Sequence, residues 1–564
     1  MDYDPERPLV VQSDRTVYLE VNHPLYAEVR ERLHGFAELV KSPEYIHTYR
    51  LTPLSLWNAA ASGWSSEQVL RVLHQYAKFP IAYAVQQSIV EEMSQLGRYQ
   101  LTRGADGELL LVSREKGALD ELTRFPALTG FFDGDIFATT ETGKRFWAVN
   151  VRPEHRGDLK QQCIRLGYPV QDEAGYRDGD QLTLSFRHTL PNGRPFQLRP
   201  YQREALDAFQ GKGALAGGHG VLVLPCGAGK TVIGLAAIVD QQCAALILTP
   251  NVTAVKQWKR ELLEKTDLSA ELIGEYTGEL KQIRPVTIAT YQVLTHRASP
   301  TDAFVHMHLF QKRNWGLIIY DEVHLLPAPV FRATASIQST RRLGLTATLV
   351  REDGRAEDVF SLIGPKRYDL PWKKLESEGF IATAFCTEVK VDFDDALRQR
   401  YYTLPKRQRM RLAQENPHKV EIVKQLLAKH EGAAVLIIGQ YVRQLEALGM
   451  LLDIPVITGK MKQEKREVLF ERFRQGEIPV LAVSKVANFA IDLPDAEVAI
   501  QISGAFGSRQ EEAQRLGRIL RPKEGENEAY FYHIVTKDSE DEEYAAKRQL
   551  FLVEQGYRYQ LMES

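Results

Sequence analysis

Short apolar runs alternate with helical patterns from residue 197 onward, and this alternation constrains the fold more than any other feature of the chain. Each run is rich in Val, Ile, Leu or Ala, and the clearest lie at 221–224, 245–248, 317–320, 435–438 and 480–483. Consecutive apolar positions indicate strands buried on both faces, and helical crossovers between them indicate parallel pairing. The pattern therefore predicts an α/β fold with two RecA-like parallel sheets, one before and one after about residue 380.

The first 190 residues have a different texture. Up to about residue 94, β-like runs are mixed with amphipathic helical periods such as that of Ser65 to Tyr76, which predicts a small α/β domain. From about residue 95, short apolar or alternating segments, at 109–112, 146–151 and 181–186, are separated by turns rich in Gly and Asp, which predicts a small β-rich module. The predicted domains are 1–94, 95–190, 191–380 and 381–564.

Composition narrows the class of protein. Of the 564 residues, 44% are hydrophobic and 26% are charged, which is typical of a globular protein and not of a disordered one. The formal net charge is −2, so local basic surfaces would have to hold any nucleic-acid partner. The four cysteines are far apart, which predicts neither a zinc site nor a disulfide framework. We find no signal peptide and no apolar run of the ~20 residues that span a membrane, so we expect a cytoplasmic protein.

The strongest chemical signal is a glycine-containing loop between an apolar strand and a helical pattern. The loop follows Leu224-Pro225-Cys226 and consists of Gly227, Ala228, Gly229, Lys230 and Thr231. Glycines in such a turn let consecutive amides point at phosphate oxygens at the N-terminus of a helix. We expect Lys230 to reach the β- and γ-phosphates of ATP and Thr231 to ligate Mg²⁺. The strict pattern has Gly at Leu224, so a structural turn is the alternative, which the strand–loop–helix context disfavours.

A pair of carboxylates follows the strand at 317–320. Asp321 and Glu322 would lie at the carboxyl end of a buried parallel strand, where ligands bind in open α/β sheets. We expect Asp321 to hold Mg²⁺ and Glu322 to orient and deprotonate the attacking water. A helix-capping pair is the alternative, and the upstream phosphate loop makes it the weaker one.

Two arginines in the second half of the chain complete the predicted ATP site. Arg518 and Arg521 are three residues apart in the pattern Gln514 to Arg521, so they share one helix face and could point across a cleft between two lobes. An arginine that contacts the γ-phosphate when the lobes close is an arginine finger. A solvated basic helix is the alternative if the segment is taken alone.

In their order along the chain, these three elements resemble the motif set of superfamily 2 helicases. Further segments of this chain resemble the other motifs of that set, namely Leu198–Gln202, Leu248–Asn251, Ile288–Gln292, Thr346–Thr348 and Ser484–Asp492. The resemblance implies that Gln202 reads adenine and that Asp492 belongs to the nucleotide site. It also implies that a further group of residues contacts nucleic acid or couples it to hydrolysis, namely Thr249, Thr290, His324, Thr346, Thr348 and Ser484.

Within that superfamily the chain resembles the XPB family, a family of DNA repair and transcription helicases. The segments that carry this resemblance are Leu224–Lys230, Leu349–Asp353, Tyr544–Tyr557 and the stretch from Pro8 to about Pro80. The resemblance implies that Arg351, Glu352 and Asp353 open duplex DNA. It also places a damage-recognition-like domain at 95–190. Motif V departs from the family, because Ser484 replaces a Thr and Ala487-Asn488 replaces Gly-Asp.

The same resemblance places a thumb-like insertion at about 395–415. Within it, the segment Leu397 to Leu412 carries six positive charges, including Arg407 and Arg409, interleaved with Tyr401 and Tyr402. Such a pattern suits phosphate contacts and base stacking. A solvated helix face is the alternative.

Taken together, these features predict an ATP- and Mg²⁺-dependent DNA helicase or duplex translocase. Its 3′-to-5′ polarity is implied by the family alone. The expected partners are duplex and single-stranded DNA and either a companion nuclease or repair and transcription factors, with no membrane, in the nucleoid of a prokaryotic cell. An RNA-dependent ATPase or a restriction-type motor is the alternative enzyme. A catalytically dead scaffold is disfavoured, because Lys230, Glu322 and Arg521 are all present.

Overall fold

The computed structural model describes most of the chain, in two units defined by their internal contacts. The described residues are 4–43, 45–141, 144–211, 217–225, 227–297, 304–347, 356–484, 496–504 and 527–563. The first unit is Met1–Glu38, Tyr49–Leu224 and Gly229–Asp369, and the second is Leu39–Thr48, Pro225–Ala228 and Leu370–Ser564. Seven residues predicted to be functional lie outside the described residues: Thr348, Arg351, Glu352, Asp353, Asp492, Arg518 and Arg521.

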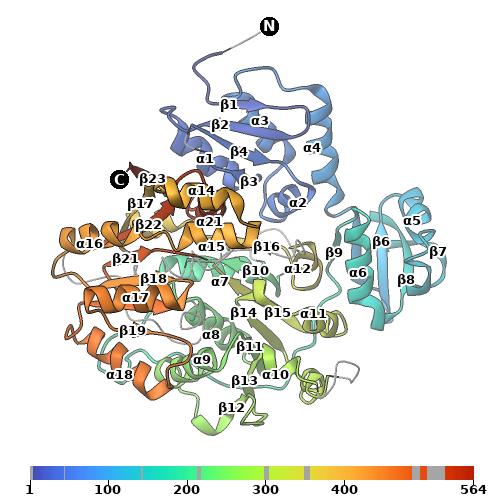
Figure 1. Cartoon of the computed structure of the whole chain (residues 1–564). Coiled ribbons are helices and arrows are strands. Elements are labelled where there is room, and N and C mark those ends of the chain that lie inside the picture. The colour runs from blue at the N-terminus through green and yellow to red at the C-terminus, as the bar shows by residue number, and fades with distance from the viewer. Residues whose placement is uncertain are drawn as a thin grey trace. The chain divides into compact units, whose positions relative to one another are not determined.

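A seven-stranded parallel sheet forms the core of the first unit, which we call lobe 1 where it surrounds this sheet (Figure 1). Its strands, in spatial order, are β12 (Ile273–Tyr276), β13 (Val286–Thr290), β11 (Ala245–Thr249), β14 (Leu317–Asp321), β15 (Arg341–Thr346), β10 (His219–Val223) and β16 (Lys366–Asp369). Its helices include α7 (Pro200–Gln210), α8 (Lys230–Gln241), α9 (Val252–Lys265), α10 (Tyr291–Leu294), α11 (Ala328–Ala335) and α12 (Ala356–Leu362). Every residue of β10, β11 and β13 is buried, as the apolar runs predicted.

A second seven-stranded parallel sheet forms the core of the second unit, which we call lobe 2. Its strands, in spatial order, are β19 (Val456–Ile457), β20 (Val480–Ser484), β18 (Val435–Gly439), β21 (Val498–Gln501), β22 (Glu528–Thr536), β17 (Thr383–Val391) and β23 (Tyr559–Glu563). Its helices include α13 (Trp372–Ser377), α16 (Lys419–Lys429), α17 (Val442–Leu452), α18 (Gln463–Arg474) and α21 (Glu540–Glu554). The prediction of two parallel sheets divided near residue 380 is confirmed.

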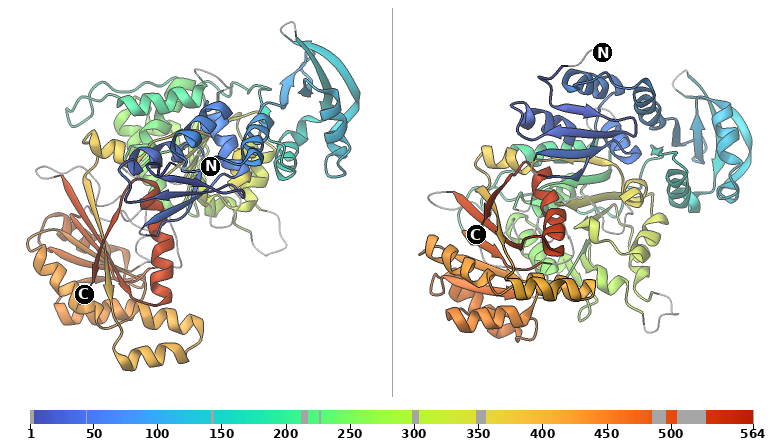
Figure 2. Two further views of the ribbon diagram at one scale, coloured as in Figure 1. Left: turned by 90° about the horizontal axis from the view of Figure 1, so that it is seen from above. Right: turned by 45° about the horizontal axis from the view of Figure 1, so that its top comes forward.

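The segment between β17 and α16 forms a helical hairpin at the margin of the second sheet (Figure 2). It consists of α14 (Asp395–Thr403) and α15 (Lys406–Gln414). Pro405 lies directly before α15, at the end of the extended turn between the two helices. Proline suits the start of a helix, because it cannot continue a helix that precedes it. The hairpin spans the residues for which the thumb-like insertion was predicted, and its role as a thumb stays a prediction.

The N-terminal part of the chain contains a four-stranded sheet and helices that follow it. The strands, in spatial order, are β1 (Leu9–Val11), β2 (Thr16–Glu20), β4 (Ile46–Arg50) and β3 (Glu38–Lys41). The helices are α1 (Tyr26–His34), α2 (Pro53–Ala61), α3 (Ser66–Tyr76) and α4 (Tyr83–Gln95). The predicted helix from Ser65 is confirmed, with the Ser65 hydroxyl capping α3 by accepting a hydrogen bond from the amide of Gln68.

The predicted β-rich module is a five-stranded sheet (Figure 1). Its strands, in spatial order, are β7 (Phe132–Glu141), β8 (Lys144–Val151), β6 (Leu109–Ser113), β5 (Tyr99–Arg103) and β9 (Val170–Asp172), with α5 (Lys116–Thr123) and α6 (Arg156–Arg165). The strand predicted at 181–186 is wrong, because that segment makes only isolated bridges, from Gln181 to Cys243 and from Phe186 to Thr266. Both partners belong to lobe 1, so this segment runs along lobe 1 and does not close the module.

A close backbone contact joins the module to lobe 1, and a cluster of buried charges lies within the module beside it. Asp172 receives a bidentate pair of hydrogen bonds from Arg156, at 3.1 and 2.7 Å, and an ion pair from Lys160 at 2.7 Å. All three residues are at most 4% exposed. Burial lowers the pKa of Lys160 to about 7 against the opposing charge of Asp172. A Cβ atom on Gly157 in α6 would lie 2.2 Å from the carbonyl oxygen of Ala335 in α11, so only glycine permits this approach.

A smaller ionic cluster connects the N-terminal part to β16. Asp369 lies 3.1 Å from Nε2 of His34 and 2.7 Å from Nζ of Lys366. Burial alone would raise the pKa of Asp369, but the charges of Lys366 and His34 hold that pKa well below its ordinary value of 3.8. A carboxyl whose pKa is lowered by folding stabilises the fold above its unfolded pKa, and this stabilisation is lost as the pH falls.

We therefore expect the Asp369→Asn variant to unfold at a lower temperature than the wild type at about pH 6, and the difference to shrink below about pH 4. Calorimetric unfolding of both proteins across this range is the measurement. A difference that stays constant down to the lowest pH would contradict the role of the carboxylate charge.

Two further observations concern the helices and the cysteines of the described residues. No described helix combines the length and the apolar character needed to cross a bilayer. Among the described residues, Cys163, Cys243 and Cys386 are buried.

Candidate active site

The glycine-containing loop connects β10 to α8 in the way the sequence predicted. After β10 the amide of Leu224 donates a hydrogen bond to the carbonyl of Thr346 at 2.9 Å, and α8 begins at Lys230. Gly227 has φ +82° and Gly229 has φ +79°, a left-handed conformation that favours glycine. The side-chain amide of Gln202 lies against the loop, because a Cβ atom on Gly229 would be 2.6 Å from its Nε2. Oε1 of Gln202 accepts a hydrogen bond from the amide of Arg199 at the start of α7.

The two predicted carboxylates lie at the end of β14, and one of them faces the loop lysine. Nζ of Lys230 is 3.4 Å from Oε1 of Glu322, and both side chains are largely buried. Oδ2 of Asp321 accepts a hydrogen bond from the indole nitrogen of Trp258 in α9 at 2.9 Å. Glu322 has φ +50° and ψ +56°, so the chain turns in a left-handed conformation directly after the strand. The structure thus brings Lys230, Asp321 and Glu322 together.

The local charges set different proton affinities for the two carboxyls. Burial and the neighbouring charge of Glu322 raise the pKa of Asp321. Burial alone would raise the pKa of Glu322 as well, but the charges of Lys230 and His324 outweigh it and lower that pKa. Glu322 therefore keeps its negative charge. Oε1 of Glu322 faces Nζ of Lys230, and its Oε2 faces Nδ1 of His324.

A short chain of contacts connects Glu322 to the end of β15. Nδ1 of His324 is 3.5 Å from Oε2 of Glu322 and 2.6 Å from Oγ1 of Thr346. The hydroxyl of Tyr291, next to Thr290, donates a hydrogen bond to the main-chain carbonyl of Asp321 at 2.8 Å. Of the predicted coupling residues, His324 thus lies beside Glu322, and Thr346 contacts His324. Sequence reasoning missed Trp258 and Tyr291, because an aromatic residue in an amphipathic pattern is indistinguishable from an ordinary core residue.

Three residues predicted to contact or couple nucleic acid are buried within their lobes. Thr249 is 0% exposed and its hydroxyl bonds the carbonyls of Asn251 and Ala289, both at 3.3 Å. Thr290 is 3% exposed and caps α10 by accepting from the amide of Val293. Ser484 is 1% exposed at the end of β20. Direct contact of these hydroxyls with DNA is not compatible with their burial here. A coupling role, through the main chain that they position, fits these residues better.

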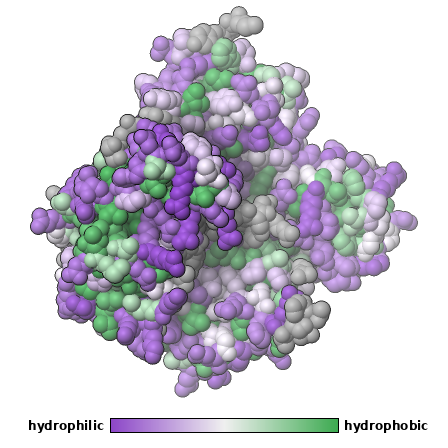
Figure 3. Space-filling model, in the orientation of Figure 1, coloured by the Kyte–Doolittle hydropathy of each residue, from purple (hydrophilic) through white to green (hydrophobic). Residues whose placement is uncertain are grey.

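The hairpin of α14 and α15 presents basic residues but not both of its tyrosines. Arg407 is exposed, and mainly hydrophilic residues cover α14 and α15 (Figure 3). The guanidinium of Arg409 is 5.9 Å from the ring centroid of Tyr401. Tyr401 is only 4% exposed, and its hydroxyl accepts a hydrogen bond from the amide of Glu540 at 2.9 Å. Base stacking by Tyr401 is therefore wrong, whereas Tyr402 is 65% exposed and remains available.

The residues around the loop suit a nucleotide-bound Mg²⁺ better than a free metal ion. Among the described residues, no group of three or more His, Cys, Asp or Glu side chains could hold a metal ion. Mg²⁺ at phosphate-transfer sites is held by one or two protein oxygens together with phosphates and water, so such a cage is not needed. The partly buried carboxylate of Asp321 and the hydroxyl of Thr231 in the first turn of α8 fit this smaller ligand set.

Known helicases match this chain in sequence over almost its whole length. The family description "ERCC3/RAD25/XPB C-terminal helicase" matches residues 375–564, "Type III restriction enzyme, res subunit" matches 195–351, and "Helicase conserved C-terminal domain" matches 9–132. The chain is 51% identical to DNA 3′-5′ helicase XPB of Mycobacterium tuberculosis, over 98% of this chain and 97% of that protein. It is 49% identical to DNA 3′-5′ helicase XPB of Kineococcus radiotolerans, over 99% and 96%.

A more distant relative has the same extent. The chain is 33% identical to the general transcription and DNA repair factor IIH helicase/translocase subunit XPB of Antonospora locustae, over 98% of this chain and 81% of that protein. Because identity of this size extends over nearly the full length of the chain and of its relatives, the chain belongs to the XPB family of DNA helicases.

Proposed function

We propose that this protein is an ATP-dependent DNA helicase or duplex translocase with 3′-to-5′ polarity that acts in nucleotide excision repair or in transcription. One observation carries the hydrolytic part of this proposal: the Glu322 carboxyl, whose pKa is lowered, lies 3.4 Å from the phosphate-loop lysine Lys230 at the carboxyl end of a strand of the parallel sheet. The DNA substrate and its polarity are those in the names of the relatives.

The residues of the proposed ATP site have different roles in hydrolysis. The amides of Gly227 and Gly229 and the ammonium of Lys230 bind the phosphates of ATP. Glu322 orients the attacking water and accepts its proton, because its lowered pKa keeps it in the carboxylate form. Thr231 and Asp321 would hold Mg²⁺, which when bound neutralises charge on the β- and γ-phosphates.

Further residues of the proposed site come from the family pattern. Gln202 is proposed to read adenine, since its amide lies against Gly229. Asp492 is proposed to contribute to the nucleotide site. Arg518 and Arg521 are proposed as the arginines that stabilise charge on the γ-phosphate during hydrolysis.

The decisive experiment measures the ATPase rate with duplex DNA, single-stranded DNA and RNA, alongside strand displacement. We expect DNA to stimulate hydrolysis and 3′-to-5′ displacement to follow it. Stimulation by RNA alone would favour the RNA-dependent ATPase. The second alternative is a restriction-type motor, because residues 195–351 match the restriction enzyme family description. DNA cleavage by the pure protein would favour this alternative.

We expect the Lys230→Ala variant to abolish hydrolysis, because the main cation beside the phosphates is removed, while DNA affinity stays largely intact. The measurement is ATP turnover beside DNA binding by fluorescence anisotropy. Turnover close to that of the wild type would overturn the proposed ATP site.

We also expect the Arg351→Ala variant to lose strand separation more than ATP turnover, by about tenfold against about twofold, if Arg351, Glu352 and Asp353 act on the duplex. The ratio of base pairs opened to ATP hydrolysed measures this. Equal losses in both activities would count against an opening role.

A further inference from the structure

The indole of Trp258 binds the carboxylate that is proposed to hold Mg²⁺. Trp258 lies in α9 and is only 1% exposed. Its Nε1 donates a hydrogen bond to Oδ2 of Asp321 at 2.9 Å. Among the described side chains, it is the only one that donates a hydrogen bond to this carboxylate. An indole has one donor and no acceptor, so the only polar atom of this side chain is used on Asp321.

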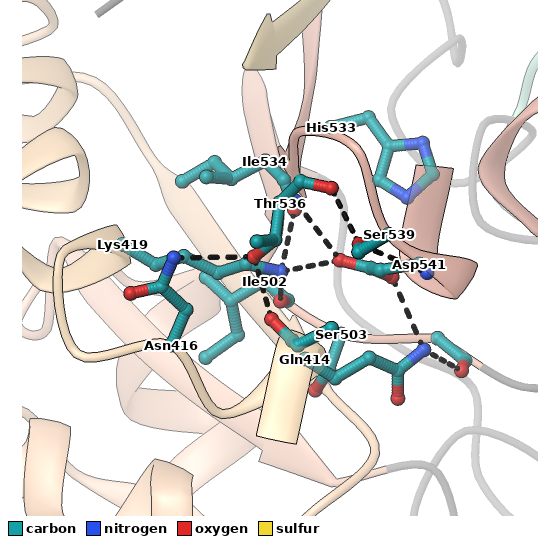
Figure 4. A network of polar contacts seen from close by, with 12 residues as sticks. Gln414, Asn416, Lys419, Ile502, Ser503, His533, Ile534, Thr536, Ser539 and Asp541 are labelled. Carbon is teal, nitrogen blue, oxygen red and sulfur yellow. Dashed lines mark hydrogen bonds and ion pairs between the residues drawn. The ribbon is translucent and has the colours of Figure 1, made fainter. Parts of the chain in front are cut away.

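Asp541 of lobe 2 shows how a carboxylate looks when protein groups bind both of its oxygens (Figure 4). Its Oδ2 accepts hydrogen bonds from Nζ of Lys419 at 2.7 Å and from the amide of Thr536 at 3.3 Å. Its Oδ1 accepts one from Nε2 of Gln414 at 3.3 Å. An ionised carboxylate can accept about four hydrogen bonds, so the single side-chain donor leaves Asp321 with acceptor positions for an ion or its water.

The indole ring is fixed on its other edge by α8. A Cβ atom on Gly234 in α8 would lie 2.4 Å from Cη2 and 3.0 Å from Cζ3 of Trp258. These two atoms belong to the six-membered ring, which therefore packs directly against the main chain of α8. The ring fills the space between the helix that begins at Lys230 and the end of β14. Its N–H is thereby directed at Asp321.

The sequence of α9 determines that Trp258 faces inward. Val255, Trp258 and Leu262 are the buried residues of this helix, and their spacing of three and four residues places them on one face. Asn251 fixes the start of the helix, because its side chain accepts a hydrogen bond from an amide of the first turn at 2.9 Å. Trp258 is the only one of the three buried residues that carries a polar atom.

We propose that Trp258 is a positioning residue that orients the Asp321 carboxylate for Mg²⁺. The proposal rests on the proposed function, in which Asp321 and Thr231 hold this ion. The indole N–H engages Oδ2 and holds the carboxylate plane against rotation about the Cβ–Cγ bond, so the carboxylate is already oriented when nucleotide and ion arrive. Loss of such a hydrogen bond to a metal ligand typically costs about 10–100-fold in metal affinity or activity.

The test compares Trp258→Phe with the matched control Trp315→Phe in the full chain. Trp315 is also a buried tryptophan of lobe 1, at 0% exposure, but its indole donates to the carbonyl of Leu309 at 2.9 Å and not to a carboxylate. The readouts are the Mg²⁺ concentration at half-maximal ATP turnover, the Kd of a fluorescent ATP analogue with Mg²⁺ and with a chelator, and the unfolding temperature.

We expect Trp258→Phe to raise the half-saturating Mg²⁺ concentration about tenfold relative to the control, while the Kd for the metal-free analogue changes less than about twofold. Phenylalanine keeps most of the ring but cannot donate a hydrogen bond, so the preference of the site for the Mg²⁺ form of the analogue should fall as well. A residue that only fills the core would lower the unfolding temperature and leave the Mg²⁺ dependence equal to that of the control, and this result would overturn the proposal.

A second replacement guards against loss of packing. In β-(3-benzothienyl)alanine a sulfur atom replaces the indole N–H and the shape of the ring is kept, so this residue at position 258 should shift the Mg²⁺ dependence in the same direction. Asp321→Asn, run alongside, separates two levels. Unchanged Mg²⁺ dependence there would refute Asp321 as a ligand in the proposed function. A shift there, with control-like behaviour in both replacements of Trp258, would refute the positioning role alone.

Discussion

The Glu322→Gln variant should hydrolyse ATP about 10²–10⁴-fold more slowly than the wild type, in the presence or absence of DNA. The amide keeps the size of the side chain but cannot accept the proton of the attacking water. It also removes the charge that faces Lys230 at 3.4 Å. ATP itself should still bind, because the loop and Lys230 are intact. The measurement is single-turnover hydrolysis beside equilibrium binding of a fluorescent ATP analogue.

Glu275→Gln supplies the matched control for this experiment. Glu275 lies in β12 of the same sheet and also pairs with a lysine, Lys259, at 2.7 Å. Its amide variant should leave turnover within about twofold of the wild type, as expected for a charge away from the reaction. Slow turnover in Glu275→Gln, or normal turnover in Glu322→Gln, would remove Glu322 from the role of general base.

The Asp172→Asn variant should lower the free energy of unfolding by about 3–5 kcal/mol. Arg156 and Lys160 are at most 4% exposed, so neutralising their shared partner leaves two buried cations without a countercharge. Burial already lowers the pKa of Lys160, and without the opposing charge of Asp172 this pKa would fall further. Part of the lost stability would therefore appear as deprotonation of Lys160. Urea unfolding followed by tryptophan fluorescence measures the change.

Asp133→Asn is the control for this stability prediction. Asp133 pairs with Arg152 at 3.2 Å in the same module, but both side chains are well exposed, at 65% and 43%. Exposed pairs of this kind contribute about 0–1 kcal/mol. Similar losses in the two variants would show that burial of the Asp172 cluster has no special effect on stability.

Much of the fold was predictable because its signals are local. The apolar runs at 221–224 and 435–438 gave strands β10 and β18, since a strand buried on both faces leaves a continuous apolar signature. The run at 181–186 alternates polar and apolar residues, as a half-buried strand does, and is not a strand. Its hydrogen-bonding partners lie in lobe 1, far from it in sequence, and no local pattern encodes them.

In the candidate site too, features with a local signal were predictable and features set by distant packing were not. Lys230 and Glu322 were predictable, because chemistry demands those residue types directly after a strand, and the structure brings them together. The burial of Thr249 and Tyr401 was not predictable, since whether a hydroxyl or ring faces solvent depends on the packing of distant elements. The roles of Arg351 and Arg518 lie outside the described residues and stay predictions.

The close approach of Gly157 to Ala335 has a mechanical consequence for the β-rich module. Contact this close leaves no room for a side chain between α6 and α11, and Gln161 and Arg165 of α6 also contact Asp358 of α12 in lobe 1. Any side chain at position 157 would therefore have to push α6, and the module with it, away from α11. The seating of the module on lobe 1 thus depends on the absence of a single Cβ atom.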